Sequence, residues 1–341
     1  MSDKISFYRS CYPSLAFKNR SAPCAWPYRQ PPTIQAHTMT RFALFAPTLA
    51  PVLALASAAS AQQIAFTWDD LPAHGQLPPG VTRVQVGKQL IAAMQTAHLP
   101  PAWGFVNGVH TTEEPDSTPM LKDWRDAGFP LGNHTWSHMS LNRTPLPDWE
   151  ADLTKNEPVL QSYMPADSWR WVRFPYLDEG DTPDKRAAAR KYLAAYGYKI
   201  AAVTTSFGDY LFNGPYARCV AKKDTAAIAQ LEKTYLDAAA DNLDFSRAMS
   251  QTLFKRDIPY VLLMHVGAFD ARMLPRLIQL YQSKGVTFVS LEDAEKDPFY
   301  ATDLDLTLPG TPDTLESAMV ARGLPFPPHP KLDVDPESLC K

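Results

Sequence analysis

The sequence predicts an α/β fold in which a parallel sheet is covered by helices, organised as one large domain. From Gln62 onward, short runs rich in β-branched and aromatic residues alternate with longer segments of helical period, which is the pattern of strands joined by helical crossovers. If the chain is cut after Ala61, about 280 residues remain (341 minus 61), a length that suits one domain. Hydrophobic residues make up 45% of the chain, enough to bury a sizeable core.

The expected strands are short and apolar, and there are seven of them. They lie near Ile64 to Trp68, Ala102 to Val106, Phe129 to Gly132, Trp169 to Phe174, Lys199 to Thr205, Tyr260 to His265 and Val286 to Ser290. Parallel strands need long crossover connections, and the segments between these runs are long enough to supply them.

The expected helices fill the segments between the strands. They are placed around Leu90 to Ala97, Leu121 to Gly128, Pro183 to Tyr196, Thr225 to Phe254 as one helix or two, and Ala271 to Ser283. The third begins after Thr182, where a hydroxyl cap precedes a first-turn proline. Residues 301–341 carry seven prolines and little period, so we expect a Pro-rich C-terminal tail that wraps the surface without a core of its own.

The N-terminal region contains an apolar stretch typical of a secretory signal peptide. Residues 42–61 are uncharged, follow Arg41 and end in the small-residue triplet Ala59-Ser60-Ala61. The alternative is a membrane anchor, because the stretch is just long enough to span a bilayer.

The stretch begins behind Met39 rather than at the first residue. We therefore expect synthesis to start at Met39, residues 1–38 to be a leader outside the native protein, and residues 39–61 to be a signal peptide removed before Gln62. This predicts a secreted or periplasmic protein with no stable membrane span after processing.

Charge and cysteine content limit the partners and the kinds of metal site. The chain has 33 Lys and Arg against 36 Asp and Glu and no basic run, so no nucleic-acid partner is expected. Only Cys219 and Cys340 follow the signal peptide, and the sequence leaves open whether they pair or stay free. No cysteine cluster has zinc-finger spacing, so any metal must be held by histidine and carboxylate.

Polar residues capable of chemistry follow the predicted strands, beginning with Asp69-Asp70 after the first. Adjacent residues at the end of a strand point to opposite sides, so both carboxylates can face one site only if the chain bends there. One carboxylate then serves as a metal ligand and the other as a base. A cation on the first relieves their mutual repulsion and keeps the second ionised.

His134 and His138 follow the third strand and are four residues apart. A helical turn would place both imidazoles on one face, ready to bind one cation, although two surface or capping histidines are the alternative. The intervening residues include no Glu, unlike the helical metalloprotease motif. The base and the third ligand must therefore come from elsewhere, and Asp69-Asp70 can supply both.

Three more motifs complete an ordered set: Arg173-Phe174-Pro175-Tyr176, Gly208-Asp209-Tyr210 and Leu263-Met264-His265. With Thr67-Trp68-Asp69-Asp70 and His134-Thr135-Trp136-Ser137-His138, this set closely resembles the polysaccharide deacetylases of the NodB-homology type, carbohydrate esterase family 4. The resemblance covers about residues 62–295, and five motifs in order are far more specific than any one of them.

The resemblance implies a fold and a role for each motif residue. The fold is a distorted seven-stranded (β/α) barrel over residues 62–300, with the site at the carboxyl ends of the strands. The implied roles are Asp69 as base, Asp70, His134 and His138 as metal ligands, Arg173 as the residue that orients Asp69, the Tyr176 amide as oxyanion donor, His265 as general acid and Asp209 as the group that sets its protonation.

The resemblance also implies a cofactor and a substrate. The cofactor is a divalent metal, with zinc the first expectation and cobalt, nickel or manganese as alternatives. The expected substrate is an N-acetylated glycan such as a chitin oligomer, peptidoglycan or an exopolysaccharide, cleaved to acetate and a free amine. Two other functions stay open: a hydrolase of a small non-sugar amide or cyclic imide, and a non-catalytic glycan-binding module.

Several residues near the motifs bear on specificity. Leu71-Pro72 stands where the family normally has Gly-Pro, and Tyr210 stands where it usually has Trp. Trp136 and Tyr210, and also Trp68, are candidates for stacking on sugar rings. His74 lies in the altered loop and is a candidate to face the substrate. These departures leave the proposed metal ligands untouched.

Overall fold

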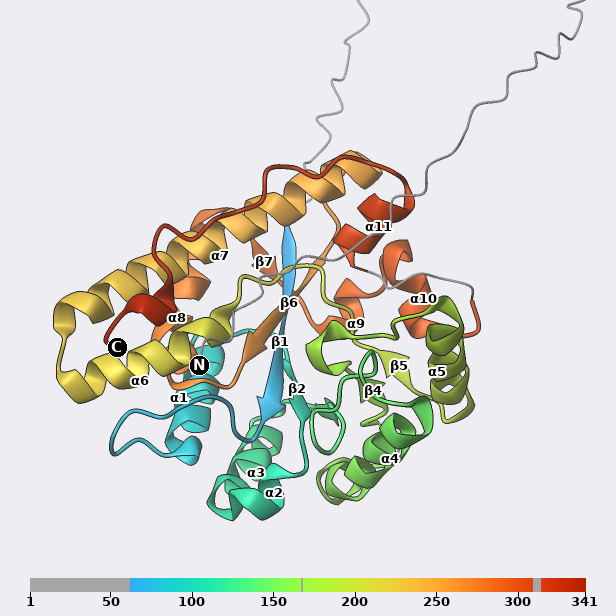
Figure 1. The fold of residues 1–341 in the computed structure, drawn as a ribbon, viewed down its shortest axis with the longest axis horizontal. Helices are drawn as coiled ribbons and strands as arrows, with labels where there is room; N and C mark the ends of the chain where they lie inside the picture. The colour runs from blue at the N-terminus through green and yellow to red at the C-terminus, as the bar shows by residue number, and fades with distance from the viewer. Residues whose placement is uncertain (1–61, 167, 309–313) are drawn as a thin grey trace, which may run out of the picture. The chain divides into compact units, whose positions relative to one another are not determined.

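The computed structural model of the chain describes residues 62–166, 168–308 and 314–341, which belong to one compact unit (Figure 1). The predicted leader, residues 1–38, and the predicted signal peptide, residues 39–61, lie outside the described residues and stay predictions. Within the described ranges, no helix is both long and apolar enough to cross a membrane.

Seven parallel strands form one curled sheet. They are β1 (Gln63–Leu71), β2 (Trp103–Val106), β3 (Leu131–Asn133), β4 (Trp171–Val172), β5 (Lys199–Ile200), β6 (Tyr260–His265) and β7 (Thr287–Phe288). Their order is β5-β4-β3-β2-β1-β6, with β7 paired to the start of β1. An isolated parallel bridge from Thr205 to Leu262 links the chain beyond β5 to β6. The prediction of a distorted seven-stranded parallel α/β barrel is confirmed.

β1 is buried on both faces and pairs with three strands, β2, β6 and β7. Residues 64–69 are all buried, as expected for a strand of a parallel sheet that is covered on both faces. It pairs with β6 from Ile64 opposite Tyr260 to Asp69 opposite His265. This register places the carboxylate that ends one strand beside the imidazole that ends the other.

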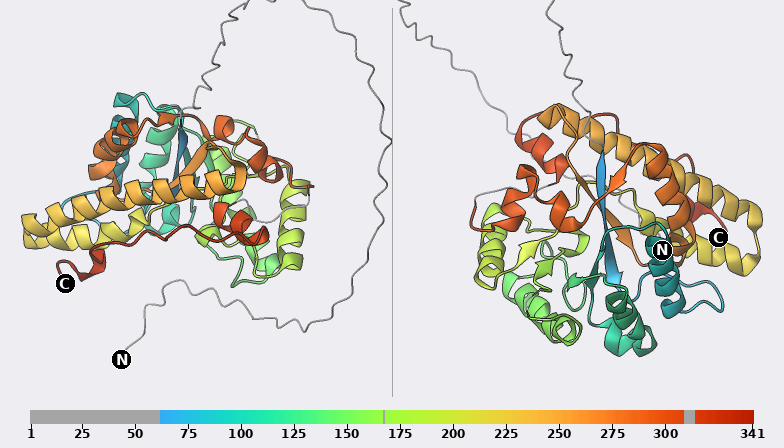
Figure 2. Two further views of the ribbon diagram at one scale, coloured as in Figure 1. Left: turned by 90° about the horizontal axis from the view of Figure 1, so that it is seen from above. Right: turned by 180° about the vertical axis from the view of Figure 1, so that it is seen from behind.

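Helices surround the sheet, as Figures 1 and 2 show from different sides. The longer ones are α1 (Arg83–Thr96), α3 (Pro119–Asp126), α4 (Leu146–Tyr163), α5 (Pro183–Ala195), α6 (Asn213–Lys222), α7 (Thr225–Phe254) and α8 (Ala268–Ser283), and the shorter ones are α2 (His110–Glu113), α9 (Leu291–Ala294), α10 (Ala301–Leu304) and α11 (Leu315–Ala321). The Thr182 hydroxyl caps α5 by accepting from the Lys185 amide, as predicted. α7 is one continuous helix of 30 residues.

α4 was not predicted from the sequence. Its buried face, which includes Trp149, Leu153 and Leu160, follows helical spacing. Pro158 lies inside the helix and interrupts the local pattern, since proline normally ends a helix at this depth. Burial of the apolar face outweighs the one backbone hydrogen bond that Pro158 removes.

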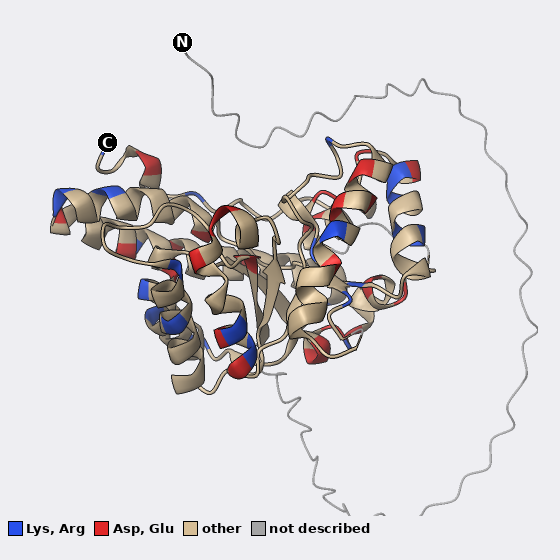
Figure 3. Cartoon of the chain, turned by 90° about the horizontal axis from the view of Figure 1, so that it is seen from below, with Lys and Arg blue, Asp and Glu red and all other residues tan. Residues whose placement is uncertain are grey.

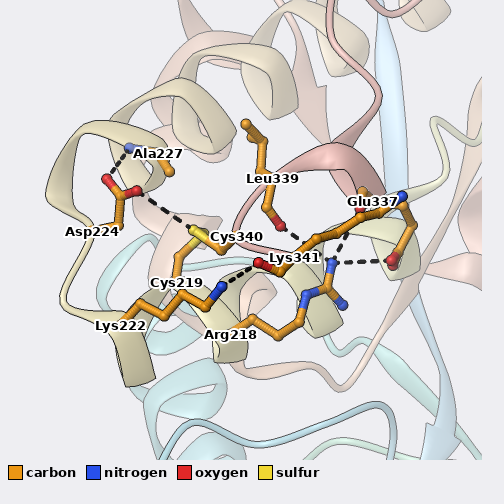
Figure 4. Close-up of a disulfide and its surroundings, with 9 residues drawn as sticks. All are labelled: Arg218, Cys219, Lys222, Asp224, Ala227, Glu337, Leu339, Cys340 and Lys341. Carbon is orange, nitrogen blue, oxygen red and sulfur yellow. Dashed lines mark hydrogen bonds and ion pairs between the residues drawn. A yellow bond between two sulfur atoms is a disulfide. The ribbon is translucent and has the colours of Figure 1, made fainter.

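The C-terminal tail runs along α7 and is tied to the body at two places (Figures 1 and 2). α11 packs against α7 and buries Leu315 and Met319. At the end of the chain Cys340 forms a disulfide with Cys219 of α6, which Figure 4 shows beside the ion pair of Arg218 with Glu337. The structure thus answers the question of pairing that the sequence left open.

Basic and acidic side chains are mixed over the helices in the view of Figure 3. Several form exposed pairs one helical turn apart, such as Lys233 with Asp237. Exposed pairs of this kind contribute little to stability, so the fold depends mainly on the buried sheet and helix faces.

Candidate active site and metal centre

The predicted site residues gather at the carboxyl ends of β1, β3, β4 and β6, the edge to which the arrowhead of β1 points in Figure 1. Asp69 and Asp70 lie at the carboxyl end of β1, just before its last residue. His134 follows β3, Arg173 follows β4 and His265 ends β6. In a parallel barrel these ends share one edge, so residues far apart in the sequence come together.

The bend that both aspartates need occurs at Asp70 itself. Its φ is 64°, in the left-handed region, and the pairing of β1 with β2 shifts register between Trp68 and Leu71. A bulge of this kind redirects a side chain at a strand end. The Ala73 amide then donates to the Asp70 carbonyl (2.9 Å) and closes the turn. Asp69 and Asp70 therefore face the same site.

His134 and His138 converge, but not on a helical turn. The segment is irregular, with φ of 60° at Thr135 and 56° at His138, and the two imidazole centroids lie 4.8 Å apart. The predicted turn is wrong because polar side chains hold the loop open: the Asn107 amide donates to the His134 carbonyl, and the Thr135 amide donates to Asn133 Oδ1. The two imidazoles therefore meet because the loop bends at Thr135 and His138, and not because residues four apart share a helix face.

Asp70, His134 and His138 offer ligand atoms that lie within 4.8 Å of one another. The Nε2 atoms of His134 and His138 lie 3.4 and 3.5 Å from Asp70 Oδ1. That oxygen is buried and has no hydrogen-bond partner among the described residues. An unpartnered buried carboxylate oxygen is costly, and a cation between these three atoms would remove the cost.

Protonation and orientation also suit these three residues to a cation. Burial, followed by repulsion from His134, lowers the pKa of His138 to about 4, so its imidazole is neutral near pH 7. Burial alone would raise the pKa of Asp70, but His134 and His74 hold it well below its usual range. His134 Nδ1 is 2.7 Å from the Arg173 carbonyl, and a proton donated there leaves Nε2 with its lone pair. This donor set fits zinc and related divalent metals.

Asp69 is buried against Arg173. Arg173 Nη1 lies 3.2 and 3.4 Å from the two carboxylate oxygens of Asp69, and both side chains are almost fully buried. The guanidinium is fixed by further donation to the Thr67 hydroxyl and the Ala201 carbonyl. Asp69 Oδ2 is also 3.6 Å from His134 Nε2, so the carboxylate borders the three-ligand cluster.

His265 is paired with Asp209, which begins the 3-10 turn η3 (Asp209–Phe212). One Asp209 oxygen accepts from the His265 amide (2.6 Å), and the other lies 3.0 Å from His265 Nδ1. Burial alone would lower the pKa of His265, but the charge and hydrogen bond of Asp209 raise it to about 10. The imidazole is therefore protonated at neutral pH.

Tyr176 and Tyr210 lie at the mouth of this site. Their side chains are 54% and 45% exposed, and their rings lie 4.5 Å from His138 and 5.3 Å from His265. Tyr176 has a φ of 59°, and its amide donates to no other group in the described part of the chain. The guanidinium of Arg143 lies over the Tyr176 ring, 5.3 Å from its centre. The Tyr176 amide and two partly exposed aromatic rings therefore border the ligand cluster.

The two tryptophans considered for sugar stacking lie elsewhere. Trp68 is fully buried and packs edge to face against Trp124, so it cannot stack on a sugar, and that expectation is wrong. Trp136 is covered by Lys155 of α4, whose Nζ is 4.5 Å from the ring centre. Among the described residues, the Trp136 ring stacks with none of the three candidate metal ligands.

His74, predicted as a candidate to face the substrate, lies beside Asp70 and His265, and its contact with the substrate stays a prediction. Its Nδ1 lies 2.7 Å from Asp70 Oδ2, and its ring centroid lies 4.7 Å from that of His265. The spacing of four residues from Asp70 was the only sequence signal for this contact. His74 is thus part of the site, in contact with a candidate metal ligand.

Comparison with known proteins agrees with the motifs. Residues 56–201 match the family model described as polysaccharide deacetylase, and no curated protein matches the chain. Similar solved structures include a family 4 carbohydrate esterase from Streptomyces lividans (17% identity, 70% of this chain, 97% of that one, TM-score 0.44). A peptidoglycan N-acetylglucosamine deacetylase catalytic domain from Eubacterium rectale has 17% identity, coverages of 67% and 88% and a TM-score of 0.47.

A third similar structure is a family 4 pseudoenzyme from Bacillus anthracis (12% identity, 69% of this chain, 66% of that one, TM-score 0.48). The family assignment depends instead on the family-model match and on the five ordered motifs, whose residues meet at one edge of the sheet. Residues 56–201 thus match the polysaccharide deacetylase family, in agreement with the resemblance of the five ordered motifs to its NodB-homology type.

Proposed function

We propose that the protein is a metal-dependent hydrolase that removes N-acetyl groups from a glycan. The observation that carries the proposal is the convergence of Asp70, His134 and His138 beside a second buried carboxylate, Asp69, which Arg173 holds in place. Three protein ligands leave a coordination position open, as in catalytic rather than structural metal sites.

The cation would polarise the attacking water and the acetyl carbonyl, and we propose zinc, with cobalt, nickel or manganese as alternatives. Asp69 acts as the base and takes a proton from the water. Arg173 Nη1 contacts the carboxylate at 3.2 Å, and Asp69 Oδ2 lies 3.6 Å from His134 Nε2, so the proposed base borders the three metal ligands.

The other residues stabilise the negative charge that develops on the acetyl oxygen and supply the proton that the departing amine needs. The Tyr176 amide is available to donate to the oxygen that becomes negative, an interaction worth several kcal/mol in comparable sites. Protonated His265 gives its proton to the departing amine, while Asp209 keeps the imidazole oriented and charged. General acid catalysis of this type typically contributes about 10²- to 10⁴-fold.

The substrate we propose is an N-acetylated sugar in a chain. Tyr210 supports this choice, because its ring is 45% exposed and lies 5.3 Å from that of His265, where a sugar ring could stack on it. We also propose that the protein is secreted or periplasmic, in agreement with the apolar segment before Gln62.

Acetate release from chitin oligomers, peptidoglycan and an acetylated exopolysaccharide tests the activity. We expect release by the zinc-loaded protein, loss on chelation, recovery on metal return and loss of at least about 10³-fold in Asp69→Asn. Glycan binding without acetate release by the loaded protein would contradict the proposal and favour a binding module. Turnover of small amides or cyclic imides alone would contradict the glycan substrate. N-terminal sequencing of exported protein should begin at Gln62.

A further inference from the structure

The two carboxylate oxygens of Asp70 have different surroundings. Oδ1 faces the Nε2 atoms of His134 and His138 at 3.4 and 3.5 Å and has no hydrogen-bond partner among the described residues. Oδ2 is instead paired with His74 Nδ1 at 2.7 Å. A cation between the two imidazoles would therefore meet one oxygen of Asp70, while the other oxygen is already engaged.

His74 is held in this position by its backbone. Arg83, the first residue of α1, donates through Nη1 to the carbonyls of His74 (2.7 Å) and Gly75 (2.8 Å). Its guanidinium is anchored in turn by Glu114 at 3.0 Å. Gly75 has a φ of 65° and packs close to Asn213, so a side chain there would be strained and crowded. These contacts hold the backbone from which the His74 ring reaches Asp70.

We propose that His74 is a positioning residue that keeps Asp70 a one-oxygen ligand, an inference that rests on the proposed metal centre. A proton donated from Nδ1 to Oδ2 fixes the rotation of the carboxylate and leaves Oδ1 aimed at the cation. Without this donor the carboxylate can turn and offer both oxygens. Partners that orient a metal ligand typically change metal affinity or activity by about 10- to 100-fold when removed.

Two substitutions separate the hydrogen bond from the ring. His74→Asn keeps an N–H donor at the δ position and removes the ring, whereas His74→Phe keeps a ring beside His265 and removes the donor. His98→Asn is the matched control, because His98 is an exposed histidine with a φ of 52°, which asparagine tolerates. His74→Ala replaces His74→Phe if circular dichroism shows that the larger ring prevents folding.

The measurements are Co²⁺ affinity, by competition with a chelator, and the visible absorption of the Co²⁺ protein, whose intensity reports coordination number. We expect His74→Phe to weaken Co²⁺ binding about 10- to 100-fold and to reduce the absorption intensity, as an added ligand oxygen would. We expect His74→Asn and His98→Asn to stay within about threefold of the parent protein and to keep its spectrum.

Each other result overturns the inference in a distinguishable way. Unchanged affinity and spectrum in His74→Phe would show that the hydrogen bond does not position Asp70. Equal losses in His74→Asn and His74→Phe would show that the ring itself is needed, as for a direct ligand. If the parent protein binds no Co²⁺, the proposed metal centre fails and this inference fails with it.

Discussion

The pair of His265 and Asp209 allows a prediction whose size can be worked out from the structure. Asp209 is fully buried and contacts both the amide and Nδ1 of His265, and together with the rest of the site it raises the pKa of this imidazole from 6.5 to about 10. Asp209→Asn keeps an oxygen that can accept from the His265 amide but removes the negative charge. The substitution therefore removes the largest contribution that offsets burial of the protonated imidazole, and leaves the smaller contributions of Asp70 and Asp69.

The difference between 6.5 and about 10 corresponds to roughly 5 kcal/mol, at about 1.4 kcal/mol for each pKa unit. In Asp209→Asn we expect the pKa of His265 to fall to about 6.5 or below. At pH 8 an imidazole with a pKa of 6.5 is only about 3% protonated. The general acid would then be lost, and activity at pH 8 should fall by about 30-fold or more, with a much smaller loss near pH 5.5.

Stability should follow the same direction. Because the pKa of His265 is raised on folding, its contribution is complete below pH 6.5 and is lost as pH rises through about 10. We therefore expect the parent protein to lose unfolding free energy over this window, and Asp209→Asn to lack that loss. The control is Asp237→Asn, which removes an exposed carboxylate paired with Lys233.

The assay is an NMR titration of the His265 imidazole in metal-free protein, assigned with His265→Gln, together with the pH profile of acetate release. The titration tests the electrostatics independently of the substrate. A His265 pKa in Asp209→Asn within one unit of the parent value would refute the reasoning. So would an unchanged alkaline limb of kcat/KM.

Three other predictions can be tested in the same protein. Asp70→Asn should weaken Zn²⁺ binding by at least about 100-fold by competition with a chelator, because a neutral amide replaces the anionic ligand; near-parent affinity would contradict the assignment. Tyr210→Ala should raise KM for a glycan with little change in melting temperature, whereas Trp136→Ala should lower the melting temperature, and the reverse pattern would exchange their roles. Cys340→Ser should lower the free energy of unfolding by about 2–4 kcal/mol in denaturant titration, because the bond to Cys219 closes a loop of 121 residues, and an unchanged midpoint would exclude this contribution.

The number and type of strands were predictable because each strand is a short buried run. Tyr260–His265 is found with the predicted bounds, while the runs near Trp169 and Lys199 shrink to two-residue strands. Apolar runs indicate burial on both faces but not how many residues pair with a neighbour. Beyond Ile200 the chain stays buried as it crosses to β6, where only Thr205 forms a bridge.

The site was predictable to the extent that its chemistry lies in residue types at strand ends. Asp70 with His134 and His138 was found in this way, and the structure brings these three residues together. The prediction for Trp68 was wrong because its place next to the candidate site aspartates does not tell whether its ring points to the core or to the mouth of the site. Strand alternation decides that question, and the bulge at Asp70 lies just beyond Trp68.

The bends that aim the ligands could not be read from the sequence. Among the described residues, Asp70, Thr135, His138, Tyr176 and Leu177 all have positive φ, although none is glycine. Each such conformation costs roughly 1–2 kcal/mol for an ordinary residue, so the local sequence argues against it. Glycine would adopt these conformations more easily, but the site needs the side chains of Asp70 and His138. Contacts with neighbouring residues must therefore hold the backbone in place. His134 is fixed through the Arg173 carbonyl, and the Asp70 bend is closed by the Ala73 amide and His74. A cation bound by Asp70, His134 and His138 would add to this restraint, so the strained backbone and the metal centre should stabilise each other.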